Sequence, residues 1–207
     1  PASITRIVVT KFHPAALIAE LHALGVRDVG ENRQQELTAK AAELSGLAGL
    51  RWHAIGQVQT NKARALRSVA AAVPLTVHSL DRERLADALD AAAPAPDDVL
   101  DVLIQVNLTD DPARGGVSPD GVEPLAEHVA TRPGLRLRGV MAVAPLDEPP
   151  ASAFARLAVC AQRVRQVDAA ADWISAGMTG DFVEAIAAGA THLRIGSAIT
   201  GPRPVRE

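Results

Sequence analysis

Short apolar runs alternate with amphipathic stretches along the whole chain. The runs are rich in β-branched residues, as strands are, whereas the stretches between them repeat apolar residues at helical spacing. The first unit is a strand followed by a helix that carries Leu17, Ile18, Leu21 and Leu24 and ends at Gly25. Strands are predicted over residues 4–10, 27–30, 50–55, 75–78, 99–107, 135–143, 173–176 and 192–195. Further helices are predicted from about Gln34, from about Asn61, and over 81–92, 122–130, 152–169 and 181–188.

Eight strands that alternate with helices predict the α/β class and, within it, a single (β/α)8 TIM barrel. A doubly wound open sheet is the alternative architecture. The Pro-rich stretches 93–97 and 145–150 are short enough to be loops, and no Gly, Ser or Pro linker divides the chain. Residues 1–207 are therefore expected to form one domain.

Composition narrows the possible partners and compartments. With 207 residues and a formal net charge of -3, the chain can bury one core and has no basic surplus for nucleic acid. No apolar run is long enough to span a membrane. Cys160 is the only cysteine, which excludes an internal disulfide and favours a helix-core role. From the last two observations we expect a cytoplasmic protein. We expect no metal site, because the Cys, His and carboxylate residues do not have the spacing of metal ligands.

Lys11 is the best-placed amine nucleophile in the sequence. It directly follows the first predicted strand, and barrels place their sites where strands end. The other two lysines, Lys40 and Lys62, fall within or at the start of predicted helices, where we expect solvated charges. A lysine nucleophile must be available in its neutral form, which burial or a nearby cation favours.

Two turns late in the chain could bind phosphate. Residues 174–181 read Ile-Ser-Ala-Gly-Met-Thr-Gly-Asp, where backbone N–H groups and the Ser175 and Thr179 hydroxyls could contact an anion. The alternative is a helix start capped by Thr179 or Asp181. Residues 192–198 read as another strand that ends in a small-residue turn. The strands before these two turns are the seventh and eighth of the chain, and the loops after those strands commonly hold phosphate in barrels.

A series of motifs lies at residues 9–11, 30–36, 52–62, 78–81, 105–107, 139–141, 175–181 and 194–197. In this order the motifs resemble those of the YggS/PROSC-type pyridoxal phosphate homeostasis family over almost the whole chain. The resemblance implies the barrel of the alanine racemase N-terminal domain, with pyridoxal 5′-phosphate (PLP) held as a Schiff base on Lys11. It further implies cofactor contacts from Asn32, Ser175, Met178, Thr179, Arg194, Gly196 and Ser197.

The roles implied for these residues differ. Ser175, Thr179, Gly196 and Ser197 would hold the phosphate, and Arg194 would face the pyridine nitrogen, which an arginine leaves largely unprotonated. Asn32 would lie near the cofactor or cap a helix. Thr200 departs from the family, where an aromatic residue is usual.

The implied function is intracellular PLP (vitamin B6) homeostasis without robust catalysis, with PLP and apo PLP-dependent enzymes as partners and a monomer as the expected state. The resembled racemase mechanism needs a tyrosine base, and this sequence contains no tyrosine. His53 and His78 are expected to be scaffold hydrogen bonders, as is the isolated carboxylate of Glu31. Two alternatives stay open: a slow PLP-dependent amino-acid racemase, and a cofactor-free barrel enzyme that acts on a phosphorylated metabolite.

Overall fold

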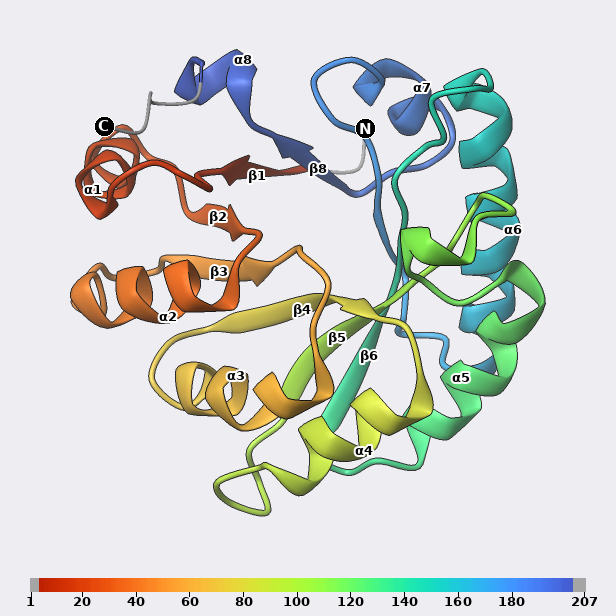
Figure 1. Ribbon diagram of the computed structural model, residues 1–207, viewed down its shortest axis with the longest axis horizontal. Coiled ribbons are helices and arrows are strands. Elements are labelled where there is room, and N and C mark those ends of the chain that lie inside the picture. The colour runs from red at the N-terminus through yellow and green to blue at the C-terminus, as the bar shows by residue number, and fades with distance from the viewer. Residues whose placement is uncertain (1–3, 203–207) are drawn as a thin grey trace.

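Eight parallel strands close into a barrel in the computed structural model, which describes residues 4–202 (Figure 1). Each strand pairs with its neighbours in sequence, and β1 pairs with β8 from Thr5 with His192 to Val8 with Ile195. The predicted barrel is confirmed, and the open sheet is excluded. The strands are β1 (Thr5–Val9), β2 (Asp28–Glu31), β3 (Arg51–Ala54), β4 (Leu75–Leu80), β5 (Leu100–Gln105), β6 (Leu135–Met141), β7 (Trp173–Ser175) and β8 (His192–Ile195).

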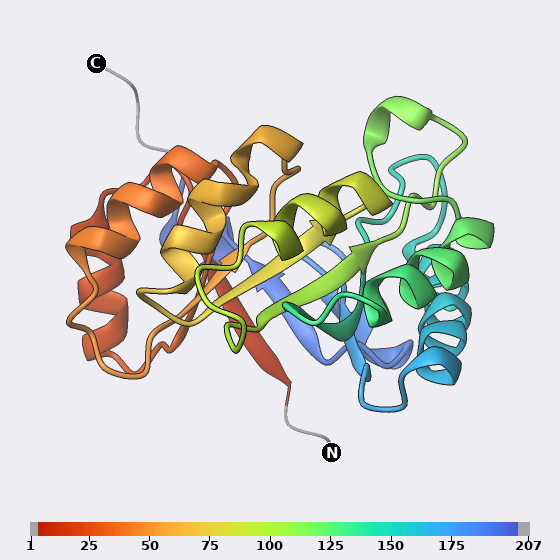
Figure 2. The ribbon, with the colours of Figure 1, turned by 90° about the horizontal axis from the view of Figure 1, so that it is seen from below.

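Helices follow the strands and surround the barrel (Figures 1 and 2). Gly25, at a φ of 94°, follows the first of them with the left-handed backbone that favours glycine. They are α1 (Ala15–Ala23), α2 (Gln34–Glu43), α3 (Ala63–Ala70), α4 (Glu83–Ala91), α5 (Val122–Ala130), α6 (Pro150–Val167), α7 (Phe182–Ala187) and α8 (Ser197–Thr200), with short 3-10 turns at Thr60–Lys62, Pro112–Arg114 and Pro119–Gly121.

Successive side chains of each strand point to opposite faces of the sheet and so lie in two different environments. Val29, Trp52 and Val77 belong to the apolar core. Burying an aliphatic side chain such as that of Val29 or Val77 stabilises the fold by roughly 1.5–3 kcal/mol. His53 and His78, which follow Trp52 and Val77, are buried too but bond to other polar groups. The strands therefore pack an apolar layer against the helices and enclose polar side chains within the barrel.

The predicted elements differ from the observed ones mainly at their ends. The predicted strand over 99–107 is shortened to Leu100–Gln105, and the helix predicted over 152–169 begins earlier, at Pro150. The small-residue turn predicted after the last strand instead starts α8. Cys160 is buried in α6, as expected. Within residues 4–202, no helix is both long and apolar enough to cross a bilayer.

Candidate functional site

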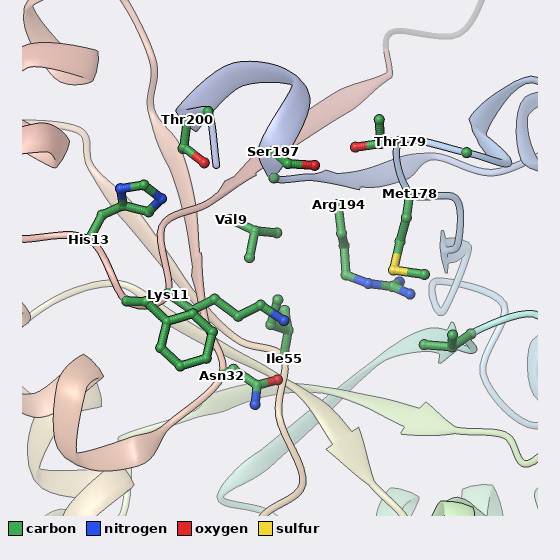
Figure 3. Close-up of a pocket in the computed structure, with 15 residues that line it drawn as sticks. Val9, Lys11, His13, Asn32, Ile55, Met178, Thr179, Arg194, Ser197 and Thr200 are labelled. Carbon is green, nitrogen blue, oxygen red and sulfur yellow. The ribbon is translucent and has the colours of Figure 1, made fainter. Parts of the chain in front are cut away.

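A cavity of about 450 Å³ opens where β1, β2, β7 and β8 end (Figure 3). Seven of the eight predicted site residues line it: Lys11, Asn32, Met178, Thr179, Arg194, Gly196 and Ser197. The structure therefore brings together residues from both ends of the sequence, because β1 and β8 are neighbours in the closed barrel. Val9, Ile55 and Val143 add apolar walls, as is usual in small-molecule sites.

Lys11 extends its amine into the cavity from the loop after β1 (Figure 3). The next residue, Phe12, has a φ of 71°, which is unusual for a residue with a side chain. Its backbone N–H donates to Glu36 Oε2 at 3.0 Å, and the Arg33 guanidinium lies 5.2 Å from its ring centre. Contacts from the start of α2 thus stabilise the turn that presents Lys11.

The prediction that Lys40 is a solvated charge is wrong, because its side chain is buried. Its ammonium donates to Glu31 Oε1 at 2.8 Å and to the Thr10 carbonyl at 3.0 Å. Lys40 lies three residues after buried Leu37, on the same side of α2, so helical spacing buries it despite its charge. Lys62, by contrast, stays partly exposed at the start of α3.

Glu31 is the acceptor at the centre of this cluster. It also accepts a hydrogen bond from the Thr10 hydroxyl at 2.6 Å, which confirms its predicted hydrogen-bonding role. Burial raises the pKa of Glu31, and the bonds from Lys40 and Thr10 oppose that shift. The cluster joins the ends of β1 and β2 to α2 immediately beside Lys11.

Hydroxyl groups gather on the opposite side of the cavity. Thr179 lies in the turn after β7, and Ser197 and Thr200 lie on α8 (Figure 3). Among the described residues, no hydrogen bond to another protein group is found for these three hydroxyls. Asp181 begins α7 but does not cap it through its side chain, which instead accepts the Met178 N–H at 2.6 Å. This bond folds the turn around Thr179.

Ser175 is the one predicted site residue that does not line the cavity. It is fully buried at the end of β7, and its hydroxyl contacts Arg194 Nη1 at 2.8 Å and His78 Nδ1 at 2.9 Å. In this structure the hydroxyl thus contacts a wall residue of the cavity, Arg194, and a residue inside the barrel, His78, and its contact with a phosphate stays a prediction.

Arg194 forms one wall of the cavity and is held from beneath. Its Nη1 donates to the Ser175 carbonyl at 2.8 Å and its Nη2 to the Ala142 carbonyl at 2.8 Å. Burial lowers the pKa of Arg194 to about 10, while the more distant Asp181 carboxylate favours the charged form. The side chain is still a cation at neutral pH, so it supplies a fixed positive charge and donor to the cavity.

Asn32 approaches the cavity through a tight backbone contact. The residue before α2 is Arg33, so Asn32 does not cap that helix in the way that we considered. Gly56 lies against it: a Cβ built on Gly56 would stand 1.9 Å from the Asn32 carbonyl oxygen. Only a residue without a side chain permits this approach.

Several residues near the site had no role in the predictions. Phe12, His13 and Ile55 also line the cavity, and only their position next to strand ends could have indicated this. His53 and His78 are buried hydrogen bonders, as expected, but they contact each other inside the barrel. Over residues 4–202, no group of three His, Cys, Asp or Glu side chains could hold a metal ion.

Comparison with known proteins gives relatives that cover nearly the whole chain. Residues 5–204 match the family described as alanine racemase, N-terminal domain. A pyridoxal phosphate homeostasis protein of Mycobacterium tuberculosis is 41% identical over 96% of this chain and 82% of its own length. The protein of the same name from Pseudomonas aeruginosa is 39% identical over 98% of this chain and 86% of its own.

Solved structures agree with the sequence relatives. PipY of Synechococcus elongatus, determined with PLP bound, superposes with a TM-score of 0.86 at 34% identity and covers 97% of this chain and 94% of its own. Alanine racemase from Corynebacterium glutamicum superposes with a TM-score of 0.73 at 17% identity, over 98% of this chain and 56% of the racemase. The racemase likeness shows the barrel fold alone.

Proposed function

This chain belongs to the alanine racemase N-terminal domain family and to the pyridoxal phosphate homeostasis proteins within it, and from that premise we propose that it binds PLP through Lys11 and takes part in PLP homeostasis. The observation that carries the proposal is that the Lys11 amine, the Arg194 guanidinium and the hydroxyls of Thr179, Ser197 and Thr200 meet in one cavity. Relatives named for this function and the PLP complex of PipY support it.

The donor set fits the chemistry of the cofactor. PLP carries an aldehyde that condenses with an amine, a pyridine nitrogen and a phosphate group. Lys11 is the amine that lines the cavity, and Arg194 offers a donor that keeps its own proton. The hydroxyls of Thr179, Ser197 and Thr200 would accept or donate at the phosphate end, and Val9 and Ile55 would exclude water from the ring. Thr200, where the family usually has an aromatic residue, thus adds a polar group.

Borohydride reduction followed by peptide mass spectrometry tests the proposal directly. After incubation with PLP, the protein should carry one pyridoxyl group on Lys11, and its visible absorbance should disappear in Lys11→Arg. The matched control Lys62→Arg changes the partly exposed lysine at the start of α3 and should keep both signals. A label distributed over other amines, or none at all, would contradict the assignment.

We also propose that the protein stores or transfers PLP without robust turnover. The chain has no tyrosine to act as a second base opposite Lys11. The PLP-loaded protein is expected to exchange the α-proton of L-alanine in heavy water no faster than free PLP at the same concentration. Exchange well above that of free PLP, and lost in Lys11→Arg, would instead favour a slow racemase.

We further propose that the protein is a single-domain monomer in the cytoplasm. Apo PLP-dependent enzymes are the proposed recipients of its PLP. Size-exclusion chromatography with light scattering measures the oligomeric state. Mixing the loaded protein with an apo-enzyme, followed by the recovery of its activity, measures transfer.

A further inference from the structure

A row of buried polar side chains, joined one to the next by hydrogen bonds, crosses the barrel beneath the cavity, and we call this row the file. It runs from Arg194 on β8 through Ser175 on β7, His78 on β4 and His53 on β3 to Asp28 on β2, with donor–acceptor distances of 2.8, 2.9, 2.9 and 3.0 Å. The contact between His78 and Ser175 joins strands that are not neighbours in the sheet, so it must cross the interior.

The two ends of the file fix the direction of every hydrogen bond. Arg194 has donors only, and the Asp28 carboxylate has acceptors only. Arg51 also donates to Asp28, through Nε at 2.7 Å and Nη2 at 2.6 Å. Burial would raise the pKa of Asp28, but the bonds from His53 and Arg51 outweigh it and lower that pKa to about 2. Asp28 is therefore an anion that accepts.

Both imidazoles are neutral, so each has one donor and one acceptor nitrogen. Burial lowers the pKa of His53, against the pull of Asp28, and burial together with the Arg194 charge lowers the pKa of His78 well below its usual value. His53 then donates from Nε2 to Asp28 and accepts at Nδ1. His78 donates from Nε2 to His53 and accepts the Ser175 hydroxyl proton at Nδ1.

We propose that Asp28, His53 and His78 are positioning residues that act through Ser175 to hold the Arg194 guanidinium at the cavity. The proposal rests on the proposed function, because Arg194 matters at that wall only if a ligand with a ring nitrogen binds there. The file cannot pass a proton through to the cavity, because its last member, Arg194, has no acceptor. Instead, the file fixes the orientation of the Ser175 hydroxyl. Because this hydroxyl donates its proton to His78, its lone pair is free to accept the hydrogen bond from Arg194.

The file also connects the cavity to the opposite end of the barrel. A second cavity of about 450 Å³ lies there, and Asp28, Arg51, His53 and His192 are among its lining residues. Asp28, the acceptor end, therefore lines this second cavity, whereas Ser175 and His78 are fully buried. A change at this distant end would reach Arg194 through three side chains.

The first test needs no cofactor. Long-range proton–nitrogen spectra of protein labelled at histidine distinguish the tautomers, with the His53→Gln and His78→Gln variants used for assignment. The neutral Nε2–H tautomer is expected for both residues at neutral pH. An Nδ1–H tautomer or a charged ring at either position would overturn the file, whatever the protein binds.

The second test compares two replacements of His78. His78→Leu removes both bonds and should weaken PLP binding about tenfold and shift the absorption maximum of the bound cofactor. In His78→Gln, the side-chain amide can still accept from Ser175 and donate to His53, so both readouts should return toward those of the unchanged protein. The control His128→Leu alters a histidine on α5 that bonds to Asp87 outside the barrel and should change neither.

The outcomes separate the two proposals. If no pyridoxyl group is found on Lys11 of the unchanged protein, the proposed function fails while the tautomers still test the file. If Lys11 is labelled in the folded His78→Leu variant with unchanged affinity and spectrum, the positioning role is overturned and the proposed function stands.

Discussion

At the scale of single residues, the site depends on two backbone positions that are unusual for opposite reasons. Phe12 carries a side chain where the backbone favours glycine, and Gly56 lacks one where any Cβ would collide with Asn32. The first is held by a bond to Glu36, and the second holds Asn32 at the cavity wall. Both lie next to residues that line the cavity.

The Gly56→Ala variant tests the second position. Because the new Cβ would stand 1.9 Å from the Asn32 carbonyl oxygen, the backbone must move, at a cost of about 2 kcal/mol in the free energy of unfolding. Urea unfolding measures this cost, and PLP titration measures the expected loss of affinity as Asn32 shifts. Gly46→Ala is the control, because nothing lies within 4 Å of its Cβ position. Equal stability of the two variants would contradict the argument.

At the scale of elements, α2 is fastened to the ends of β1 and β2 by one buried ion pair. The Lys40 ammonium contacts Glu31 and the Thr10 carbonyl, and it lies 3.8 Å from Glu36. Removing only the cation would leave a buried carboxylate without its counter-charge, which is the costly way to break such a pair.

Lys40→Met should therefore lower the free energy of unfolding by about 3 kcal/mol at neutral pH. Lys62→Met, at the partly exposed start of α3, should change it by no more than about 0.5 kcal/mol. Urea unfolding at neutral pH compares the two. Part of the Lys40→Met deficit should be recovered near pH 5, because burial raises the pKa of Glu31 and protonation removes the unpaired charge. A deficit that does not change with pH would point to packing instead of charge.

The elements themselves were largely predictable, because their periodicity is local. The spacing of Leu17, Ile18 and Leu21 predicts α1, and the eight strands follow from runs of β-branched residues. Two local features differ from the predictions. The charge of Lys40 predicts a solvated side chain, but its three-residue spacing from buried Leu37 places it inward. Ser197–Thr200 is too short for a helical period to be visible.

The file beneath the cavity lay beyond sequence reasoning. His78 and Ser175 are 97 residues apart in the chain, and their contact depends on strand register and on the closure of the barrel. A polar residue at every second position of a strand indicates one face. It does not say which residue of another strand it meets.

At the scale of the whole molecule, the barrel encloses imidazoles that are neutral in the folded state. Burial lowers the pKa of His53 and His78, and it lowers that of His192 to about 4. An unfolded histidine takes up a proton near pH 6.5. Between about pH 6.5 and 4 the unfolded chain therefore binds more protons than the folded one, and the free energy of unfolding falls as the pH falls.

The His192→Phe variant tests how much one imidazole contributes to this fall in the free energy of unfolding. For a pKa lowered from 6.5 to about 4, His192 accounts for about 3 kcal/mol of the fall over this range, and the variant should lose that share. Trp173→Phe is the control, since its ring lies 4.2 Å from that of His192 and does not titrate. Urea midpoints from pH 7 to 4 give both slopes. Equal slopes for His192→Phe and the unchanged protein would contradict the prediction.

The pairing of β1 with β8 has a consequence for biosynthesis. Lys11 follows the first strand and Arg194 lies on the last, so the cavity cannot form until nearly all of the described chain has been translated. At ordinary elongation rates, the amine emerges from the ribosome on the order of ten seconds before its partners across the cavity. A nascent chain therefore exposes Lys11 before the pocket around it exists, and the PLP capture that we propose for this lysine begins only once Ser197–Thr200 has been translated.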